Sequence, residues 1–526
     1  MIRFLSLLAA SVCAAVGVMV EFHDTTSVET VNLGFDGISF FTDSDTFPRT
    51  GIKVITFETG SQNDDIDIAA GGQKGTNTDE LLKMSADARI LFPDSRGILL
   101  IDDGRNTLRE DGTRSYTYHM VYLILSNTRR YYATYSGYFE EGENEITINF
   151  ARVIKPDGET VELAPGDIKI QTPPSQGSLF FGRGKIITFT LPGVEIGDIV
   201  EYSYEDITLN PWNKEIFEAG YYFQADDPYI FSRLAIDVPE DEPIMWKGYN
   251  MPEESSQPKI EENDGRKTYT WLCENVAPYV PEPYAPPSGD FLSRVEVTNQ
   301  STWDKLYDWY AGFQLERMGI TPRIQELADS LSSGVLPSQD KVASIYHWMQ
   351  TDIRYISVKG AAGSGVSGHP ASFTLERGFG DCTDKSILFS TLLRASGIEA
   401  YPVYVGTNLS VPLLDPALPQ YYGNHCITEV YLGDSSIYLD ATGSQDGGYS
   451  RYPSFSSADH GIYAVNAQKR KVEVIPVPAP EQQLQKYKIE AEADTEGNLT
   501  VHTEMSFLGL SEAGWRASVR RQCRMR

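Results

Sequence analysis

The chain has 526 residues, and its 44 Lys and Arg stand against 73 Asp and Glu, which gives a formal net charge of −29. This acidic balance argues against nucleic-acid binding, because contacts to phosphates need clustered basic side chains. The length is sufficient for about three or four domains with buried cores. Five cysteines are too few for a disulfide framework in a chain this long.

The first 20 residues predict export. Arg3 supplies a positive start, and the stretch from Phe4 to Val20 is apolar or small, as in a secretory signal peptide. Residues 15–17 offer small side chains for cleavage. The alternatives are an uncleaved membrane anchor, although the stretch is short for a span of about 20 residues, and an ordinary buried N-terminal segment. We therefore expect an exported protein that is periplasmic, outer-surface or secreted, and anchoring through the N-terminus stays open.

The next two segments differ in composition. Residues 21–87 are acidic and rich in turn formers, and the runs 64–67 and 71–75 only partly match calcium loops, so no metal site is expected. Residues 88–277 contain many short runs rich in Val, Ile, Tyr and Phe, which are separated by turn signals such as 156–158. This spacing predicts an antiparallel β-sandwich.

A Pro-rich stretch at 278–290 predicts a semi-rigid linker and a domain boundary. Beyond it, residues 291–475 predict an α+β domain, because helical patterns come first and strand patterns follow. Alternation resumes within 476–526 and predicts an incomplete β segment, since two strands cannot form a sandwich alone. The expected helices lie around 303–310, 321–331 and 338–353, and the expected strands are 400–406, 425–432 and 435–441.

The strongest chemical signal is Cys382, which stands where a loop turns into a helix. Residues 382–396 carry apolar side chains at helical spacing, Asp381 can cap the start, and Gly397 can close the end. Unpaired N–H groups and the helix dipole favour a thiolate in this first turn. Since a thiolate is a nucleophile, Cys382 is a candidate catalytic residue.

A base for this nucleophile is found downstream. His425 opens a strand pattern that ends at Leu432, and residues 433–434 predict a two-residue turn into a second strand. With that turn, His425 pairs with residue 442, and Asp440 lies diagonally opposite His425 on the same face. A carboxylate there could hold the imidazole in one tautomer, whereas a loop of odd length would turn Asp440 away.

This order of Cys, His and Asp resembles the transglutaminase-like superfamily, whose core is similar to papain-type cysteine proteases. The resemblance implies Cys382 as nucleophile, His425 as general base and acid, and Asp440 as the orienting carboxylate, with no cofactor. The matching runs are residues 377–382, 392–400, 424–425 and 438–442.

The resemblance extends upstream. Residues 151–158 and 188–202 are similar to an uncharacterised β-rich domain that often precedes such cores in bacterial envelope proteins. One departure lies at 359–370, which is more Gly-rich than is usual in the family. Groove and oxyanion residues are expected near that stretch, so their identity stays open.

The resemblance implies a cysteine-dependent acyl-transfer enzyme that acts on protein or peptide amides through a thioester, with cell-envelope components as further partners. Crosslinking, deamidation and proteolysis stay open. The alternative is a non-catalytic envelope scaffold, or a carbohydrate- or protein-binding protein with a degenerate core. His369 is a rival base, while Asp384 and Lys385 are expected to be first-turn helix residues. No zinc, phosphate-loop or dinucleotide motif is present, so no cofactor or metal is expected.

Overall fold

The structure is a computed structural model that describes residues 75–519, apart from 173–183, 284, 335–336, 357–365, 408–413, 443–461, 510, 513 and 517. It also gives the backbone of β1 (Ala15–Phe22), β2 (Ser27–Thr30), β3 (Gly34–Phe35), β4 (Ser39–Phe41), β5 (Thr46–Pro48) and β6 (Ile52–Thr59). Most of the predicted signal peptide and of the Gly-rich stretch lies outside the described residues. None of the described helices is long and apolar enough to cross a membrane.

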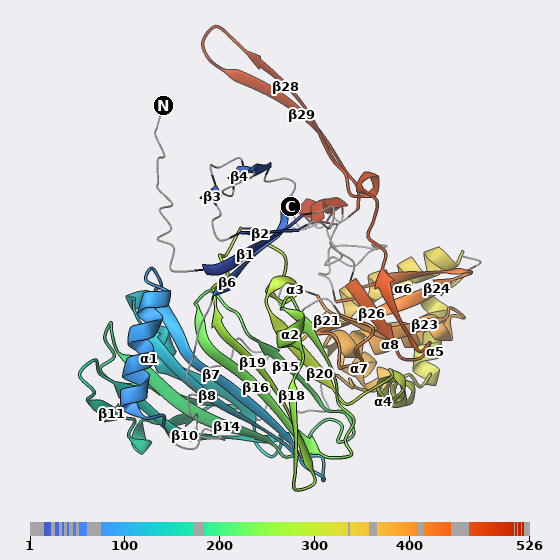
Figure 1. The fold of residues 1–526 in the computed structure, drawn as a ribbon. Helices are drawn as coiled ribbons and strands as arrows, with labels where there is room; N and C mark the ends of the chain where they lie inside the picture. Colours follow the sequence, from blue (N-terminus) through green and yellow to red (C-terminus); the bar gives the residue numbers. More distant parts are fainter. Residues whose placement is uncertain are drawn as a thin grey trace.

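The β domain is built on an eight-stranded sheet (Figure 1). Its neighbouring strands pair antiparallel except β7 and β16, which are parallel. The prediction of antiparallel pairing is wrong for this pair. Parallel neighbours need a long connection between them, and the chain between β7 and β16 is long enough to provide one. Across the sheet the order is β11 (Thr160–Glu162), β10 (Asn144–Ile154), β14 (Ile199–Thr208), β8 (Arg114–Ile124), β7 (Gly97–Leu108), β16 (Tyr229–Pro239), β19 (Arg266–Val276) and β18 (Lys259–Asn263).

Two small sheets pack on one face of the large sheet. Alternating residues of β8 show which side of the large sheet each neighbour covers. Met120 and Tyr122 pack with the first small sheet, whereas Val121 and Leu123 point to the other side and pack under helix α1. The first small sheet contains β12 (Lys169–Gln171), β13 (Gly184–Thr190) and β9 (Thr134–Glu140), and the second contains β15 (Glu218–Tyr222), β20 (Arg294–Thr298) and β17 (Met245–Tyr249). Short helical turns are η2 (Asn127–Ala133), η3 (Pro165–Asp167) and α2 (Glu253–Ser256).

Helix α1 (Thr78–Leu91) was not predicted from the sequence. The Asn77 side chain caps it by accepting hydrogen bonds from the N–H groups of residues 79 and 80. Leu81 and Ala88 are fully buried against the sheet. The predicted boundary between residues 87 and 88 therefore falls inside a helix of the β domain.

The Pro-rich segment does not end the β domain. After it the chain forms α3 (Ser288–Phe291) and then β20, which pairs with β15 and β17. The change to the α+β domain therefore comes after Thr298 rather than at residue 291. The sequence pattern could not show this, because β20 is a single short strand whose partners lie far away in the chain.

Among its described residues, the second domain has five helices and one five-stranded sheet, in the predicted α+β order. Its central helix, α8, is buried between the other helices and the sheet. The helices are α4 (Asp304–Arg317), α5 (Pro322–Leu331), α6 (Ser338–Asp352), α7 (Ala371–Arg377) and α8 (Cys382–Ala395). The sheet order is β25 (Ser435–Leu439), β24 (His425–Leu432), β23 (Ala400–Val405), β26 (Ile462–Asn466) and β27 (Lys471–Ile475), and β21 (Arg354–Tyr355) pairs with β22 (Phe379–Gly380) beside it.

Beyond the turn η4 (Pro480–Gln482), β28 (Gln485–Ala493) and β29 (Leu499–Phe507) form a hairpin. Figure 1 shows that it extends away from both domains. These two strands match the two that alternation predicted within residues 476–526. As a whole, the structure confirms a multidomain α+β chain with a β-rich domain before the α+β core.

Candidate active site

Cys382 is the first residue of helix α8, as the sequence predicts. The Asp381 carboxylate accepts the Asp384 N–H at 3.0 Å, and the Asp384 carboxylate accepts the Asp381 N–H at 3.2 Å. This reciprocal capping box fixes the loop that presents the thiol. At the other end Gly397, with φ of 82°, closes the helix as predicted.

The hairpin after α8 has the predicted register. Leu432 pairs with Ser435, and Thr428 pairs with Leu439, around a two-residue turn. Asp440 follows β25 directly, and its Oδ2 lies 3.0 Å from Nε2 of His425. The two-residue turn therefore places the Asp440 carboxylate on the same face as the His425 imidazole. This is the arrangement that the sequence predicts for a turn of this length.

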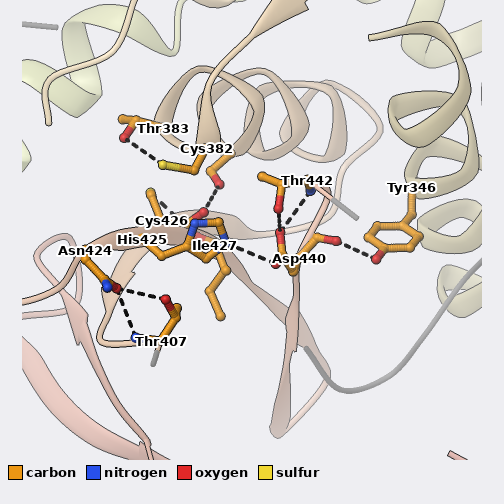
Figure 2. Close-up of polar contacts among 11 residues, drawn as sticks. Tyr346, Cys382, Thr383, Thr407, Asn424, His425, Cys426, Ile427, Asp440 and Thr442 are labelled. Atoms are coloured by element: carbon orange, nitrogen blue, oxygen red, sulfur yellow. Dashed lines mark hydrogen bonds and ion pairs between the residues drawn. The ribbon is translucent and has the colours of Figure 1, made fainter. Parts of the chain in front are cut away.

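Three contacts hold Asp440 in place (Figure 2). Its Oδ1 accepts the Thr442 N–H at 2.9 Å and the Thr442 hydroxyl at 2.5 Å. Its backbone oxygen accepts the Tyr346 hydroxyl at 2.6 Å. The sequence predicts the helix that carries Tyr346 but not this contact, since nothing local links the residue to a position 94 residues later.

His425 lies between two acidic partners. Burial alone would lower its pKa, but hydrogen bonds with Asp440 and with the Cys382 side chain more than offset that and raise the pKa to about 10. Burial alone would raise the pKa of Asp440, but the hydrogen bond from His425 more than offsets this and holds that pKa below its usual value. The arrangement thus stabilises an imidazolium with a carboxylate on one side and the sulfur on the other.

Cys426 is a second thiol close to the site. Alternation on the strand turns it away from the His425 face, yet it belongs to the same buried cluster as Cys382. Burial and the nearby charge of Cys382 raise the pKa of the Cys426 thiol well above its usual value. Cys426 is therefore a neutral buried thiol beside the nucleophile, and helix α8 rests on this part of β24.

Lys385 has a structural role that could not be predicted from its neighbours in the sequence. Its side chain is only 1% exposed, and its Nζ donates to the backbone oxygens of Met349 at 3.0 Å and Ile353 at 2.6 Å. Burial lowers its pKa to about 8. Its ammonium group satisfies carbonyls at the end of α6 and thereby ties that helix to α8.

A cavity of about 770 Å³ opens at Cys382 and His425. One wall belongs to the α+β core, and the other comes from the β domain. The core wall includes Tyr310, Val366, Thr383, Tyr404 and 421–424, and the β-domain wall includes Arg114, Tyr138, Glu140, Glu143, Asn144, Thr208, 210–213 and Glu218. We call this cavity the interdomain groove.

The segment that leads to His425 is held by the β domain. The Tyr421 N–H donates to Glu218 at 2.7 Å, and Gln420 donates to Glu296 at 2.8 Å. Trp212 of the β domain meets the Tyr421 ring edge-on at 6.2 Å. The β domain therefore lines the groove and also holds the loop that leads into His425 at the start of β24.

His369, the rival base, has a different environment. Its Nδ1 lies 3.0 Å from the Asp384 carboxylate, and its ring stacks on Phe373 at 4.8 Å. Among the described residues that line the interdomain groove, His369 is absent. The pair of His369 and Asp384 instead fastens the preceding loop to the start of α8.

The first prediction separates the two histidines. We expect His369→Gln to change kcat by no more than about tenfold, because an amide can keep a hydrogen bond to Asp384, whereas loss of a general base costs about 10²–10⁴-fold. Steady-state kinetics of His369→Gln beside His425→Gln measure the difference. Equal losses in the two variants would make His369 a partner in the chemistry.

The described residues contain no group of three or more His, Cys, Asp or Glu side chains arranged to hold a metal ion.

Two family models match the chain. Residues 110–280 match DUF3857, a domain of unknown function, and residues 325–449 match the transglutaminase-like superfamily. No curated protein matches the chain.

A solved structure with a similar fold supports this architecture. A proposed protease from Parabacteroides distasonis ATCC 8503 is 15% identical, has a TM-score of 0.59, and is aligned over 73% of this chain and 72% of its own. A proposed cysteine protease from Cytophaga hutchinsonii is 16% identical over 56% of this chain and 84% of its own, but its TM-score of 0.22 carries no weight. At these identities the likeness concerns the fold alone. By its two family matches, the chain has a transglutaminase-like superfamily core that is preceded by a DUF3857 domain.

Proposed function

We propose that the protein is an exported, cysteine-dependent acyl-transfer enzyme that acts on protein or peptide amides. The observation that carries this proposal is the position of His425, which is hydrogen-bonded to Cys382 and lies 3.0 Å from the Asp440 carboxylate. Sulfur, imidazole and carboxylate in this order form the arrangement that activates a thiol for attack on a carbonyl.

In the proposed reaction the Cys382 sulfur attacks the amide carbon, and a C–S bond forms as the C=O π pair moves onto oxygen. The backbone N–H of Cys382, at the first helical position, has no acceptor within its helix and can donate to that oxyanion. When the oxyanion collapses, the C–N bond breaks and the His425 imidazolium protonates the leaving amine. A thioester on Cys382 remains. Water then gives an acid, whereas an amine gives a new amide, and each regenerates the thiol.

The size of the interdomain groove supports the proposal that the substrate is a peptide. Its volume of about 770 Å³ lies in the upper part of the range for ligand sites, which is roughly 300–1,000 Å³. Because both domains line it, we propose that the substrate is held between the DUF3857 domain and the core. The β domain would then be part of the enzyme rather than a separate module.

A panel of Gln- and Asn-containing peptides, with and without a primary amine, tests the proposal. Ammonia release alone indicates deamidation, a new isopeptide bond indicates crosslinking, and new peptide termini indicate proteolysis. The matched control is Cys382→Ala. If no peptide gives any of these products above the Cys382→Ala background, the catalytic proposal fails.

The alternative, an envelope scaffold with an inactive core, makes the opposite prediction about the thiol. A catalytic Cys382 should react with iodoacetamide faster than Cys273, whose pKa is raised by burial. Mass spectrometry of the two labelled peptides gives both rates in one sample. Equal, slow labelling of the two thiols favours the scaffold.

We also predict a pH profile. The pKa of His425 is raised from 6.5 to about 10, so the imidazolium that protonates the leaving amine persists well above pH 6.5 and is lost as pH rises through about 10. We therefore expect kcat/KM to stay high in mildly alkaline solution and to fall on a limb near that pH. A fall centred near the ordinary histidine value would show that His425 is not held as an imidazolium.

Export is part of the proposal and rests on the apolar stretch after Arg3. Its test is the N-terminal sequence of the protein isolated from separated cell fractions. We expect an envelope or external fraction, with a start near residues 15–20 if the leader is cleaved. An intact N-terminus in the cytoplasmic fraction would contradict export.

A further inference from the structure

The DUF3857 domain contains a second cavity, of about 370 Å³, which shares no lining residue with the interdomain groove. It lies on the large sheet, on the face that also carries α1. Thr117 and His119 line it, and by alternation they share a face with Val121, which packs under that helix. The remaining lining residues are Asp103, Arg105, Arg233, Ala235, Glu261, Asn263, Arg266, Thr268 and Thr270.

Three guanidinium groups converge on this cavity. Arg105 and Arg266 share one carboxylate, that of Asp237, at 2.9 and 2.8 Å. Arg233 forms a two-pronged pair with Asp103 at 2.7 and 2.6 Å. Three guanidinium groups thus line this second cavity, and the carboxylates beside them are those of Asp103, Asp237 and Glu261.

The three arginines have N–H groups that are not used in their pairs with Asp237 and Asp103. Each guanidinium has five N–H groups, and the pairs with Asp237 and Asp103 use only some of them. Their side chains remain 26–36% exposed, so water or a ligand can reach them. A planar fork of this kind matches a carboxylate or phosphate.

His119 supplies the independent observation. Its side chain is 2% exposed, and its Nε2 lies 2.8 Å from the fully buried Glu201 carboxylate. Within the part of the chain that the structure describes, its other ring nitrogen, Nδ1, has no hydrogen-bond partner. Leaving a buried polar atom without a hydrogen-bond partner destabilises the folded state. A ligand in the cavity that His119 lines would remove this cost, because Nδ1 accepts from a hydroxyl when neutral and donates to an anion when protonated.

The other lining groups are suited to hydroxyls. Thr117, Thr268, Thr270 and Asn263 bring uncharged donors and acceptors around the arginines. At the rim, Glu261 pairs with Lys259 at 3.1 Å, and both side chains are mostly exposed. The cavity is therefore lined by three arginines that are paired with carboxylates, by uncharged hydrogen-bonding groups, and by the carboxylate of Glu261.

We propose that this cavity binds a small anionic ligand with a hydroxylated body, such as a sugar acid or a sugar phosphate. Its volume corresponds to the lower end of the range for small-molecule sites, roughly 300–1,000 Å³. The anionic group lies against the arginines, and the hydroxyls meet His119 and the threonines. This site does not depend on the proposed chemistry at Cys382.

Calorimetric titration of the full chain with two probes, D-glucuronate and glucose 6-phosphate, tests the proposal. We expect at least one of the two probes to bind. The probe with the higher affinity shows whether the cavity prefers a carboxylate or a phosphate. Arg105→Gln should weaken binding roughly tenfold, which is about 1.4 kcal/mol. The matched control is Arg130→Gln, an exposed arginine outside the cavity, which should leave affinity unchanged.

A second variant has the opposite expected sign. Glu261→Gln removes a negative charge from the rim and should tighten binding about two- to threefold, an effect that partial unfolding could not produce. The NMR signal of the His119 ring nitrogens should also move when the probe is added. If neither probe binds at millimolar concentration, or if Glu261→Gln weakens binding as much as Arg105→Gln does, the proposal is overturned.

Discussion

Replacing Cys382 by alanine should lower kcat/KM by about 10⁴–10⁶-fold, as removal of a catalytic nucleophile does in related thiol and hydroxyl chemistry. The loss should be this large because no other described side chain can form the thioester at the same place. Cys426 lies beside it, but burial keeps that thiol protonated. Steady-state kinetics on the best peptide amide measure the loss.

The same variant must keep its fold for this result to count. Alanine removes one sulfur from the end of a helix whose start is fixed by Asp381 and Asp384 rather than by the cysteine. We therefore expect a change in Tm of only a few degrees, as for a loss of about 1 kcal/mol. Cys273→Ala, on β19, is the matched control and should keep full activity. Residual activity above a hundredth of wild type in Cys382→Ala would exclude this residue as the nucleophile.

The second large effect concerns the carboxylate. Asp440→Asn should lower kcat by about 10³–10⁴-fold, as the same change does in a serine triad. The amide keeps an oxygen for the two contacts with Thr442, so the hairpin should remain intact. It brings an N–H against Nε2 of His425, however, which favours the wrong tautomer and removes the charge that stabilises the imidazolium.

A control for this prediction lies on the same hairpin. Asp434→Asn makes the same chemical change in the exposed turn between β24 and β25, and it should leave kcat within about twofold. The high-pH limb of kcat/KM should also move to lower pH in Asp440→Asn, because the pKa of His425 loses its carboxylate contribution. Equal, small effects of the two substitutions would mean that Asp440 does not orient the base.

Local features of the site could be read from the sequence because their causes are local. Asp381 is one residue from Cys382, and the turn at residues 433–434 alone sets which residues of the hairpin face each other. The Thr321 cap and the following proline likewise place the start of α5 where the structure has it. In each case, a few neighbouring residues determine the geometry.

Features that depend on distant residues could not be predicted in this way. The second wall of the interdomain groove comes from positions such as Arg114 and Glu218, far upstream of the nucleophile. Tyr346 reaches Asp440 only because α6 packs beside the hairpin. The sequence predicts Lys385 only as a first-turn helix residue, and its burial against the end of α6 comes from the fold. Such contacts follow from packing between elements, which periodicity along the chain does not record.

The pKa of His425, followed by ¹H–¹⁵N NMR titration, is the measurement that tests the contact among sulfur, imidazole and carboxylate most directly. We expect a value of about 10 in the intact protein, and a clearly lower value in Cys382→Ala and in Asp440→Asn, since each substitution removes one of the two groups that stabilise the imidazolium. A value near 6.5 that neither substitution changes would contradict the proposed site.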